Sequence, residues 1–234
     1  WTASNLLADR KGNLSEAHRA TIHANYIGRT PMNVGVISLI QEPGYKLRAV
    51  ANPLPAFQLA LSSFGSTLYS SLKNVPEDCT FDQSKGVQEI QGYMQKGGKL
   101  VAFDLSNATD RFPADLTFDM LDANKIGHPH DRELFRKVSR GKWTSPFGDV
   151  SWSNGQPLGL FPSFAAFALS HHALVRSVNP TFYRLLGDDI VIDKEHAGEL
   201  KKAYDMLGCK ISIEKSIDSD RLTEFAGRVI TKDR

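Results

Sequence analysis

The stretch YRLLGDDIVI, residues 183–192, places two adjacent carboxylates, Asp188 and Asp189, inside an otherwise apolar run. Neighbouring like charges repel, and a carboxylate taken out of water is costly unless it is paired or bound to a cation. Glycine and aspartate also favour tight turns, so the run indicates two short strands joined by a Gly-Asp-Asp turn. That turn alone accounts for the pair, and only a further carboxylate would indicate a binding site.

A further carboxylate stands at the end of another apolar run, KLVAFDL (99–105), which predicts a strand ending near Asp104. If the two strands are neighbours in one sheet, Asp104 and Asp188 converge on one point. Clustered carboxylates favour a hard cation such as Mg²⁺ or Mn²⁺, and two such ions suit in-line phosphoryl transfer. Taken alone, Asp104 can equally be a helix N-cap.

The rest of the chain predicts a mixture of hairpins and helices. Two apolar runs around a Pro-Gly turn, VGVISLI (34–40) and LRAVA (47–51), predict a hairpin. Apolar spacing predicts helices over 55–72, 86–96, 113–124, 162–177 and 195–207, strands over 209–213 and 224–231, and a turn-rich segment over 143–159. This irregular alternation favours an α+β fold over a doubly wound parallel sheet.

The length, composition and net charge of the chain are compatible with many kinds of globular protein. The 234 residues are 41% hydrophobic, which is enough for a substantial core, and the net charge of +2 says little about partners. Cys79 and Cys209 form no metal-ligand pattern and no disulfide framework, which favours a reducing compartment. The longest apolar run, residues 158–169, is too short to span a membrane. The chain opens on Trp1, so we expect a piece of a longer protein.

Three stretches, in this order, resemble motifs A, B and C of viral RNA-dependent RNA polymerases: FDLSNATDRFP (103–113), GQPLGLFPSFAAFALSHH (155–172) and LLGDDIVI (185–192). They are most similar to those of mitoviruses and of their narnavirus, ourmia-like and RNA-phage relatives. Four further stretches fit the same family. EPGYKLRAVANP (42–53) resembles motif F, and VPEDCTFDQ (75–83) resembles a segment between fingers and palm in mitovirus enzymes. LGCKISIEKS (207–216) resembles motif D, and EFAGRVI (224–230) resembles motif E. Seven stretches in family order are a specific signal.

The resemblance implies a right-hand polymerase with an antiparallel palm sheet, flanking helices and fingers elements, and with the thumb largely absent. Residues 1–98 would be mainly fingers, including motif F. Residues 99–234 would be palm with motifs A to E, interrupted by an inserted segment at about 111–154.

The implied activity is RNA-directed RNA polymerisation that replicates a positive-strand viral genome, with two Mg²⁺ or Mn²⁺ ions, an RNA template and product, and nucleoside triphosphates. No membrane segment is expected, protein partners are not indicated, and the place of action would be the host cell interior, the mitochondrion for a mitovirus or otherwise the cytoplasm. A reverse transcriptase and a non-catalytic RNA-binding module are the alternatives. The residue pair before Asp188 and the retained carboxylates argue against them.

The resemblance also implies the roles of individual carboxylates. Asp104 and Asp188 would hold the metal ions, with Asp189 as a supporting ligand and all three as catalytic residues. Asp110 would sense the ribose 2′-hydroxyl of the incoming nucleotide, or would merely stabilise a helix start.

Basic and loop residues complete the expected site. Lys46 and Arg48 would bind the triphosphate, although charged residues also commonly protect a solvated hairpin edge. Lys215 would be the general acid, with Lys210 as its competitor and a solvated surface lysine as the alternative for both. The loop residues expected to bind substrate are Gly155, Gln156, Pro157, Gly159 and Ser163. Mitovirus-like enzymes usually carry a serine pair where this chain has Pro162 and Ser163, so the residue that orients Asp110 stays open.

Two further features have no assigned chemistry. His171 and His172 are adjacent on a predicted helix and therefore face different directions, which favours packing or nucleic-acid contact over metal ligation. A basic run could line a template channel or simply form a solvated face: Arg132, Arg136, Lys137, Arg140 and Lys142.

Overall fold

The computed structural model describes residues 33–233 except residues 45, 213 and 215. The chain forms two compact units, each discontinuous in sequence. The first comprises the described residues up to Tyr69 together with Ala114–Ala166, and the second comprises Ser70–Pro113 and Phe167–Arg234. Helices and mainly antiparallel sheets are mixed throughout, as expected for an α+β fold.

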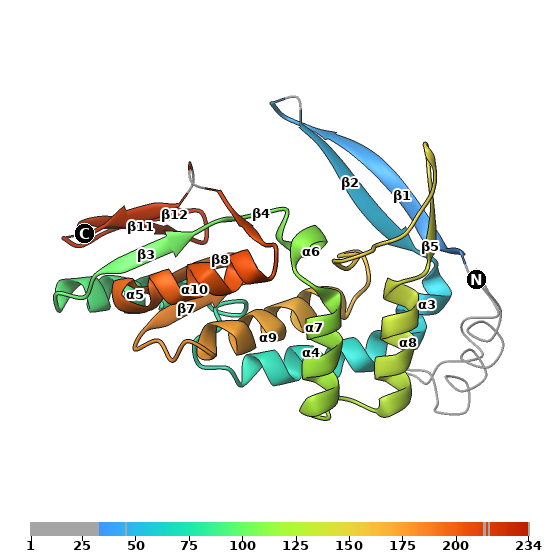
Figure 1. Ribbon diagram of the computed structural model, residues 1–234, viewed down its shortest axis with the longest axis horizontal. Helices are drawn as coiled ribbons and strands as arrows, with labels where there is room; N and C mark the ends of the chain where they lie inside the picture. The colour runs from blue at the N-terminus through green and yellow to red at the C-terminus, as the bar shows by residue number, and fades with distance from the viewer. Residues whose placement is uncertain (1–32, 45, 213, 215, 234) are drawn as a thin grey trace. The chain divides into compact units, whose positions relative to one another are not determined.

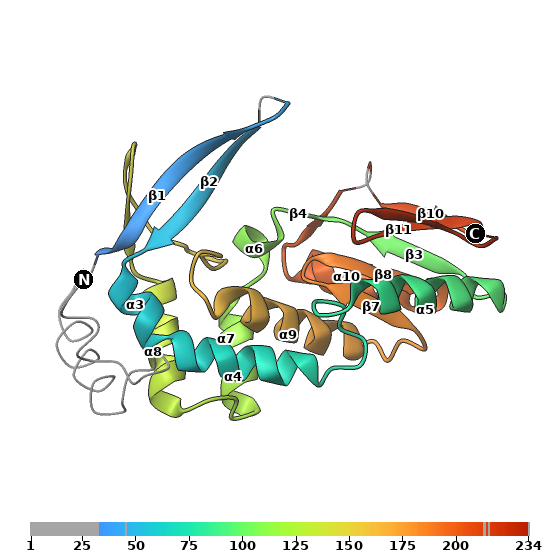
Figure 2. The same ribbon diagram turned by 180° about the vertical axis from the view of Figure 1, so that it is seen from behind.

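The first unit contains a four-stranded sheet in the order β2-β1-β5-β6. Its strands are β1 (Asn33–Glu42), β2 (Lys46–Pro53), β5 (Lys142–Ser145) and β6 (Gly148–Val150). The predicted β1–β2 hairpin is confirmed and is the long arm of Figure 2. The β5–β6 hairpin lies in the segment predicted to be only turn-rich, and β5 pairs with β1 in parallel.

Among the described residues, five helices begin in the first unit: α3 (Pro55–Ala60), α4 (Ser62–Lys73), α7 (Ala114–Ala123), α8 (Pro129–Ser139) and α9 (Ser163–Arg176). The expected single helix over 55–72 is interrupted at Leu61, which caps α3. Aromatic side chains from α4, α7 and α8 pack together, with the ring of Phe135 5.7 Å from both Phe64 and Phe118.

The second unit contains an antiparallel sheet in the order β10-β3-β8-β7. Its strands are β10 (Ile217–Ser219), β3 (Leu100–Phe103), β8 (Asp189–Asp193) and β7 (Tyr183–Leu186). The predicted strands at 99–105 and 189–192 are therefore direct neighbours. The outer edge of β7 is covered too, because Leu185 exchanges backbone hydrogen bonds with Glu77 (3.1 Å) and Cys79 (2.9 Å).

Both faces of this sheet are covered (Figure 1). On one face, α5 (Gln83–Gln95) packs with Leu100, Ala102 and Val191. On the other, α10 (Lys194–Met206) brings Tyr204 edge-on to Phe103, with ring centroids 6.2 Å apart. The helix α9 (Ser163–Arg176) carries the two histidines.

The end of the chain differs from the expectation. The single strand predicted over 224–231 is wrong, because a two-residue turn divides it into β11 (Leu222–Phe225) and β12 (Arg228–Thr231). Both turn residues, Ala226 and Gly227, have positive φ angles (53° and 68°), the geometry of a tight hairpin turn.

Short elements connect the second sheet to the rest of its unit. They are β4 (Leu105–Ser106), α6 (Ala108–Arg111) and β9 (Lys210–Ile211). Strands β4 and β9 pair in antiparallel fashion, so the strand predicted over 209–213 is present in shortened form. Over the described residues, no helix is both long and apolar enough to span a bilayer.

Candidate active site

The strand register brings three predicted carboxylates to one end of the second sheet. Phe103 pairs with Ile190 across β3 and β8, so Asp104 continues β3 at the end where β8 begins. Leu186 pairs with Asp189 across β7 and β8, which leaves Gly187 and Asp188 as the two-residue turn at that same end. The convergence expected from two strand-end aspartates is therefore present in the backbone.

The surroundings of Asp189 are acidic. The pKa of Asp189 is raised to about 6, mainly by burial and also by the negative charges of Asp188, Glu224 and Asp104, while a hydrogen bond from the backbone N–H of Ala226 opposes the rise. Asp188 is exposed and Asp104 half-buried. The sheet end thus concentrates negative charge in a partly desolvated place, and a bound cation would relieve it.

The chemistry of these donors fits a hard divalent cation, because all of them are carboxylate oxygens. The side chains are not gathered into a ready cage, since no group of three or more His, Cys, Asp or Glu residues that could hold a metal ion occurs in the described part of the chain. The two-metal assignment therefore stays a proposal.

Two serines that follow β9 support the backbone of Asp104. The N–H of Ser212 donates to the carbonyl oxygen of Asp104 (2.8 Å), and Ser216 Oγ accepts from its N–H (3.4 Å). Asp110 lies beyond β4, exposed in the first turn of α6.

The expected triphosphate-binding strand is β2 of the first unit. Arg48 is largely exposed and forms an ion pair with Glu42, with Nε 2.9 Å from Oε1. An exposed pair of this kind contributes only about 0–1 kcal/mol, so a phosphate could replace the carboxylate. The side chain of Lys46 and the whole of Lys215 lie outside the described residues. The competitor Lys210 is exposed in β9, beside Ser106 of β4.

The loop before α9 is tied tightly to its own unit. A side chain at Gly159 would place Cβ 1.6 Å from the carbonyl oxygen of Ala51 in β2, so only glycine fits there. Gln58 of α3 donates to the carbonyl oxygen of Gly159 (2.7 Å) and accepts from the N–H of Phe161 (2.9 Å). The glycine that we expected to approach substrate is therefore required for packing against β2.

The remaining loop residues expected to bind substrate are buried. Gly155 and Pro157 are enclosed, and Gln156 donates to the carbonyl oxygen of Ser163 (2.9 Å). Two buried acceptor or donor atoms, Oε1 of Gln156 and Oγ of Ser163, have no hydrogen-bond partner among the described residues. Buried polar atoms are usually paired, so these two retain hydrogen-bonding capacity.

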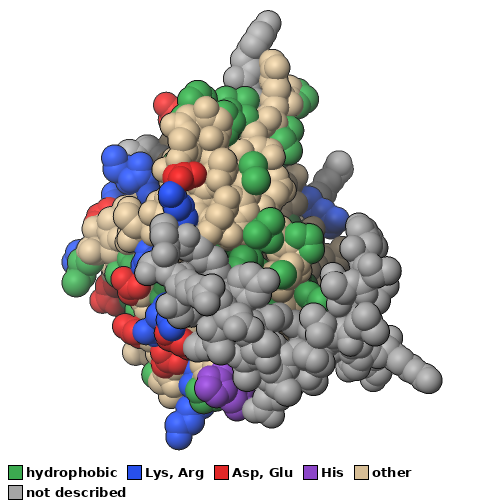
Figure 3. Space-filling view, turned by 90° about the vertical axis from the view of Figure 1, so that its right-hand side faces the viewer, with side chains coloured by type: hydrophobic (Ala, Val, Ile, Leu, Met, Phe, Trp, Pro, Cys, Tyr) green, Lys and Arg blue, Asp and Glu red, His purple; other side chains and the backbone are tan. Residues whose placement is uncertain are grey.

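The side chains of the basic run, which extends from α8 to the first residue of β5, form ion pairs with acidic partners. Asp122 of α7 binds both Arg132 (2.5 Å) and Arg136 (2.6 Å), and Asp115 binds Arg140 (2.8 Å). Lys137 and Lys142 pair with Glu133 and Asp149. Red and blue side chains are interspersed on the lower part of the face in Figure 3. These contacts favour the solvated face over the template channel.

The sequence assigns no chemistry to His171 and His172, yet in the structure they contact the hairpin that carries Asp188. Both are buried, and both bind residues of the β7–β8 hairpin. The two adjacent histidines can be seen in the sequence, but the residues that they contact depend on the tertiary fold.

Comparison with known proteins decides the family. A family model described as the mitovirus RNA-dependent RNA polymerase matches residues 4–234. The chain belongs to the mitovirus RNA-dependent RNA polymerase family. Within it, the RNA-directed RNA polymerase of Cryphonectria parasitica mitovirus 1 is 36% identical over 206 residues, which are 84% of this chain and 25% of that polymerase. An uncharacterized mitochondrial protein of Arabidopsis thaliana is 34% identical over 181 residues, 70% of this chain and 71% of that protein.

Solved structures confirm the fold expected for this family. The RNA-dependent RNA polymerase of a human picorbirnavirus matches with a TM-score of 0.69 and 17% identity, covering 85% of this chain and 43% of that one. The RNA-dependent RNA polymerase of BmCPV at elongation state matches with a TM-score of 0.60 and 12% identity, covering 84% and 21%. At these identities the likeness concerns the fold alone, and the α+β, palm-like architecture is confirmed.

Proposed function

We propose that this chain carries the nucleotidyl-transfer centre of an RNA-directed RNA polymerase that replicates a positive-strand viral genome. The observation that carries the proposal is the position of Asp104 at the end of β3, beside the Gly187-Asp188 turn and Asp189, in a chain of the mitovirus polymerase family. The chain spans a quarter of the mitovirus polymerase that it matches, so the activity of the whole enzyme is part of the proposal.

In the proposed reaction, the 3′-hydroxyl of a primer attacks the α-phosphate of a nucleoside triphosphate, and pyrophosphate leaves. Bound Mg²⁺ or Mn²⁺ ions would polarise the attacking and leaving oxygens. Asp104 and Asp188 would hold these ions, and Asp189 would support them. The oxygen-only donor set and the crowded negative charge at this sheet end support that assignment.

The other roles are proposed from the motifs. Asp110 would accept a hydrogen bond from the ribose 2′-hydroxyl, and Arg48 with Lys46 would bind the triphosphate. The motif B loop would contact template or nucleotide, with the free hydrogen-bonding capacity of Gln156 and Ser163 in its favour. Lys215 or Lys210 would donate a proton to the departing pyrophosphate.

The proposed organisation follows the motifs. Residues 1–98 would supply mainly fingers elements and 99–234 the palm, with 111–154 as the insertion. RNA template, RNA product and nucleoside triphosphates are the proposed partners. The mitochondrion is the proposed place of action, supported by the mitovirus family and by the similarity to a mitochondrial plant protein.

Primer extension tests this function. The protein is used in its natural full-length chain, with an RNA template, an RNA primer and Mg²⁺ or Mn²⁺. We expect extension with ribonucleotides that stops in excess chelator and in the Asp188→Asn variant. Extension that survives Asp188→Asn, or that prefers deoxynucleotides, would contradict the proposal.

A further inference from the structure

His171 joins the Gly-Asp-Asp turn to two helices. This α9 side chain is fully buried, with Nδ1 2.8 Å from the carbonyl oxygen of Gly187 and Nε2 2.5 Å from the hydroxyl of Tyr204 in α10. A carbonyl oxygen can only accept, so Nδ1 carries the proton and Nε2 accepts from the tyrosine hydroxyl. Burial outweighs the opposing effect of the hydrogen bond to Gly187 and lowers the pKa of His171 to about 4, so the ring is neutral at pH 7.

His172 holds the other part of the same hairpin. Its Nε2 lies 3.0 Å from Oδ2 of Asp78, and its Nδ1 lies 3.1 Å from the hydroxyl of Tyr183 in β7. Asp78 sits in the loop that pairs with Leu185 along the outer edge of β7. Adjacent residues on a helix point in different directions, so the two rings reach two separate places on one hairpin.

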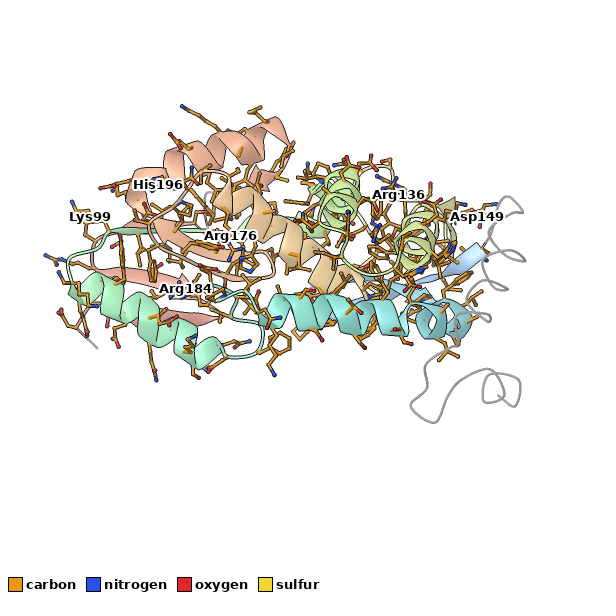
Figure 4. All side chains as sticks on the ribbon, turned by 90° about the horizontal axis from the view of Figure 1, so that it is seen from below. Lys99, Arg136, Asp149, Arg176, Arg184 and His196 are labelled. Carbon is orange, nitrogen blue, oxygen red and sulfur yellow. The ribbon has the colours of Figure 1, made fainter. Side chains whose placement is uncertain are left out.

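Arginines reinforce this edge of the hairpin. Arg176 of α9 binds the hydroxyl of Tyr183 (3.0 Å) and the carboxylate of Glu77 (2.6 Å), while Arg184 of β7 binds Glu89 of α5 (2.6 Å). Figure 4 labels both arginines. The hairpin is thus fastened along β7 by ion pairs and at its tip by His171.

The contact at the tip acts on the backbone that carries the first aspartate of the pair. The carbonyl group of Gly187 and the N–H of Asp188 belong to one planar peptide unit, so fixing the oxygen fixes the plane from which Asp188 projects. Gly187 has a φ of 63°, and a glycine can adopt several other backbone conformations about as easily. A hydrogen bond from a rigid, buried ring selects one of them.

We propose that His171 and His172 form a histidine clamp that positions the Gly187-Asp188 turn and so sets the backbone from which Asp188 and Asp189 approach a divalent cation. This inference rests on the proposed function. The histidines are positioning residues, because their ring nitrogens are occupied by Gly187, Tyr204, Asp78 and Tyr183 and are not available as metal ligands.

Two substitutions at His171 separate its two contacts. The side-chain amide nitrogen of asparagine lies near the position of histidine Nδ1, whereas glutamine places its amide near Nε2. His171→Asn therefore keeps a donor for Gly187, and His171→Gln keeps a partner for Tyr204. Tyr204→Phe is the matched control, because it removes the second contact and leaves the first.

The measurement is the affinity for Mn²⁺ alone, by electron paramagnetic resonance, on the full-length protein, with Asp188→Asn as reference. We expect His171→Gln to bind Mn²⁺ roughly ten- to a hundredfold more weakly, as do other losses of groups that orient metal ligands. His171→Asn and Tyr204→Phe should stay close to the wild type.

The clamp is refuted if His171→Asn and His171→Gln weaken Mn²⁺ binding equally, if neither weakens it, or if Asp188→Asn binds as the wild type does. A wild type that binds Mn²⁺ through Asp188 but extends no primer would overturn the proposed function and leave the clamp standing. If the His171 variants do not fold, nitrogen-15 NMR of wild-type His171 decides: a proton on Nδ1 supports the clamp, and a proton on Nε2 overturns it.

Discussion

The backbone N–H of Ala226 donates a 2.6 Å hydrogen bond to Oδ2 of Asp189, which joins the β11–β12 turn to the second aspartate of the pair. Ala226 adopts a φ of 53°, a left-handed conformation that costs a residue with a side chain about 1–2 kcal/mol. The turn between β11 and β12 is therefore strained where it touches the candidate active site.

Replacing Ala226 with glycine should remove this strain. We expect Ala226→Gly to leave the free energy of unfolding unchanged or to raise it by up to about 1 kcal/mol, because the gain is partly offset by the greater freedom of glycine in the unfolded chain. Urea denaturation measures it. The control Ala203→Gly, inside α10, should cost about 1 kcal/mol. Equal losses in both variants would contradict the assignment of strain.

Two glycines should respond to alanine in opposite ways. Gly159→Ala drives Cβ into the Ala51 carbonyl oxygen, and we expect a loss of about 3 kcal/mol or more in unfolding free energy. Gly198→Ala in α10 meets nothing within 4 Å and should gain about 0.5–1 kcal/mol through helix propensity. Thermal unfolding of the two variants side by side checks the difference. A tolerated alanine at position 159 would show that the loop does not need this close approach to β2.

Substitutions at Arg48 and Glu42 distinguish a role in triphosphate binding from a role in the stability of the β1–β2 hairpin. Arg48→Gln should lower kcat/KM for nucleoside triphosphates roughly ten- to a hundredfold, mainly through KM, because a charge-assisted contact is worth about 1.5–3 kcal/mol. Glu42→Gln breaks the same ion pair but leaves the cation, so KM should not rise. Steady-state extension with varied nucleotide measures both. A rise of KM in both variants would mean that the ion pair matters through the shape of the hairpin.

His171 should make the protein acid-sensitive. Its folded-state pKa of about 4 lies below the ordinary value of 6.5, so the unfolded chain binds the extra proton first as the pH falls. The contribution of neutral His171 to the free energy of unfolding should therefore be fully present above about pH 6.5. Protonation of this residue in the unfolded chain should lower the free energy of unfolding by about 2 kcal/mol between pH 7 and 5. Urea denaturation at several pH values checks it, with His171→Asn as the comparison. An identical slope in that variant would assign the acid sensitivity to other groups.

The strands that hold the carboxylates were predictable because local and tertiary signals agree. The apolar runs around Asp104 and the Gly-Asp-Asp turn bury both faces of β3 and β8, and a strand buried on both faces is continuously apolar. The elements that were missed lack such local signals. Strand β5 forms by pairing with β1 from a distant part of the chain, and all three residues of β6 are exposed.

The features near the site that the sequence did not show have similar physical causes. Alanine is disfavoured in a left-handed turn, so Ala226 did not predict that the segment 224–231 is divided by a turn. Gly159 looked like a flexible loop residue, although the cause of its identity is contact with Ala51. Residue types and their spacing show where charged groups lie along the chain. The partners of His171 and the ion pairs of α8 depend on how the helices and strands pack, which local sequence does not show.

The parallel pairing of β1 with β5 has a consequence for the order of synthesis. As the ribosome makes the chain, the β1–β2 hairpin is complete long before Lys142–Ser145 emerges, at a delay on the order of ten seconds. During that interval one edge of β1 offers unpaired backbone groups to any passing strand. The nascent first unit should therefore depend on chaperones until β5 pairs with the first residues of β1, Asn33–Val36.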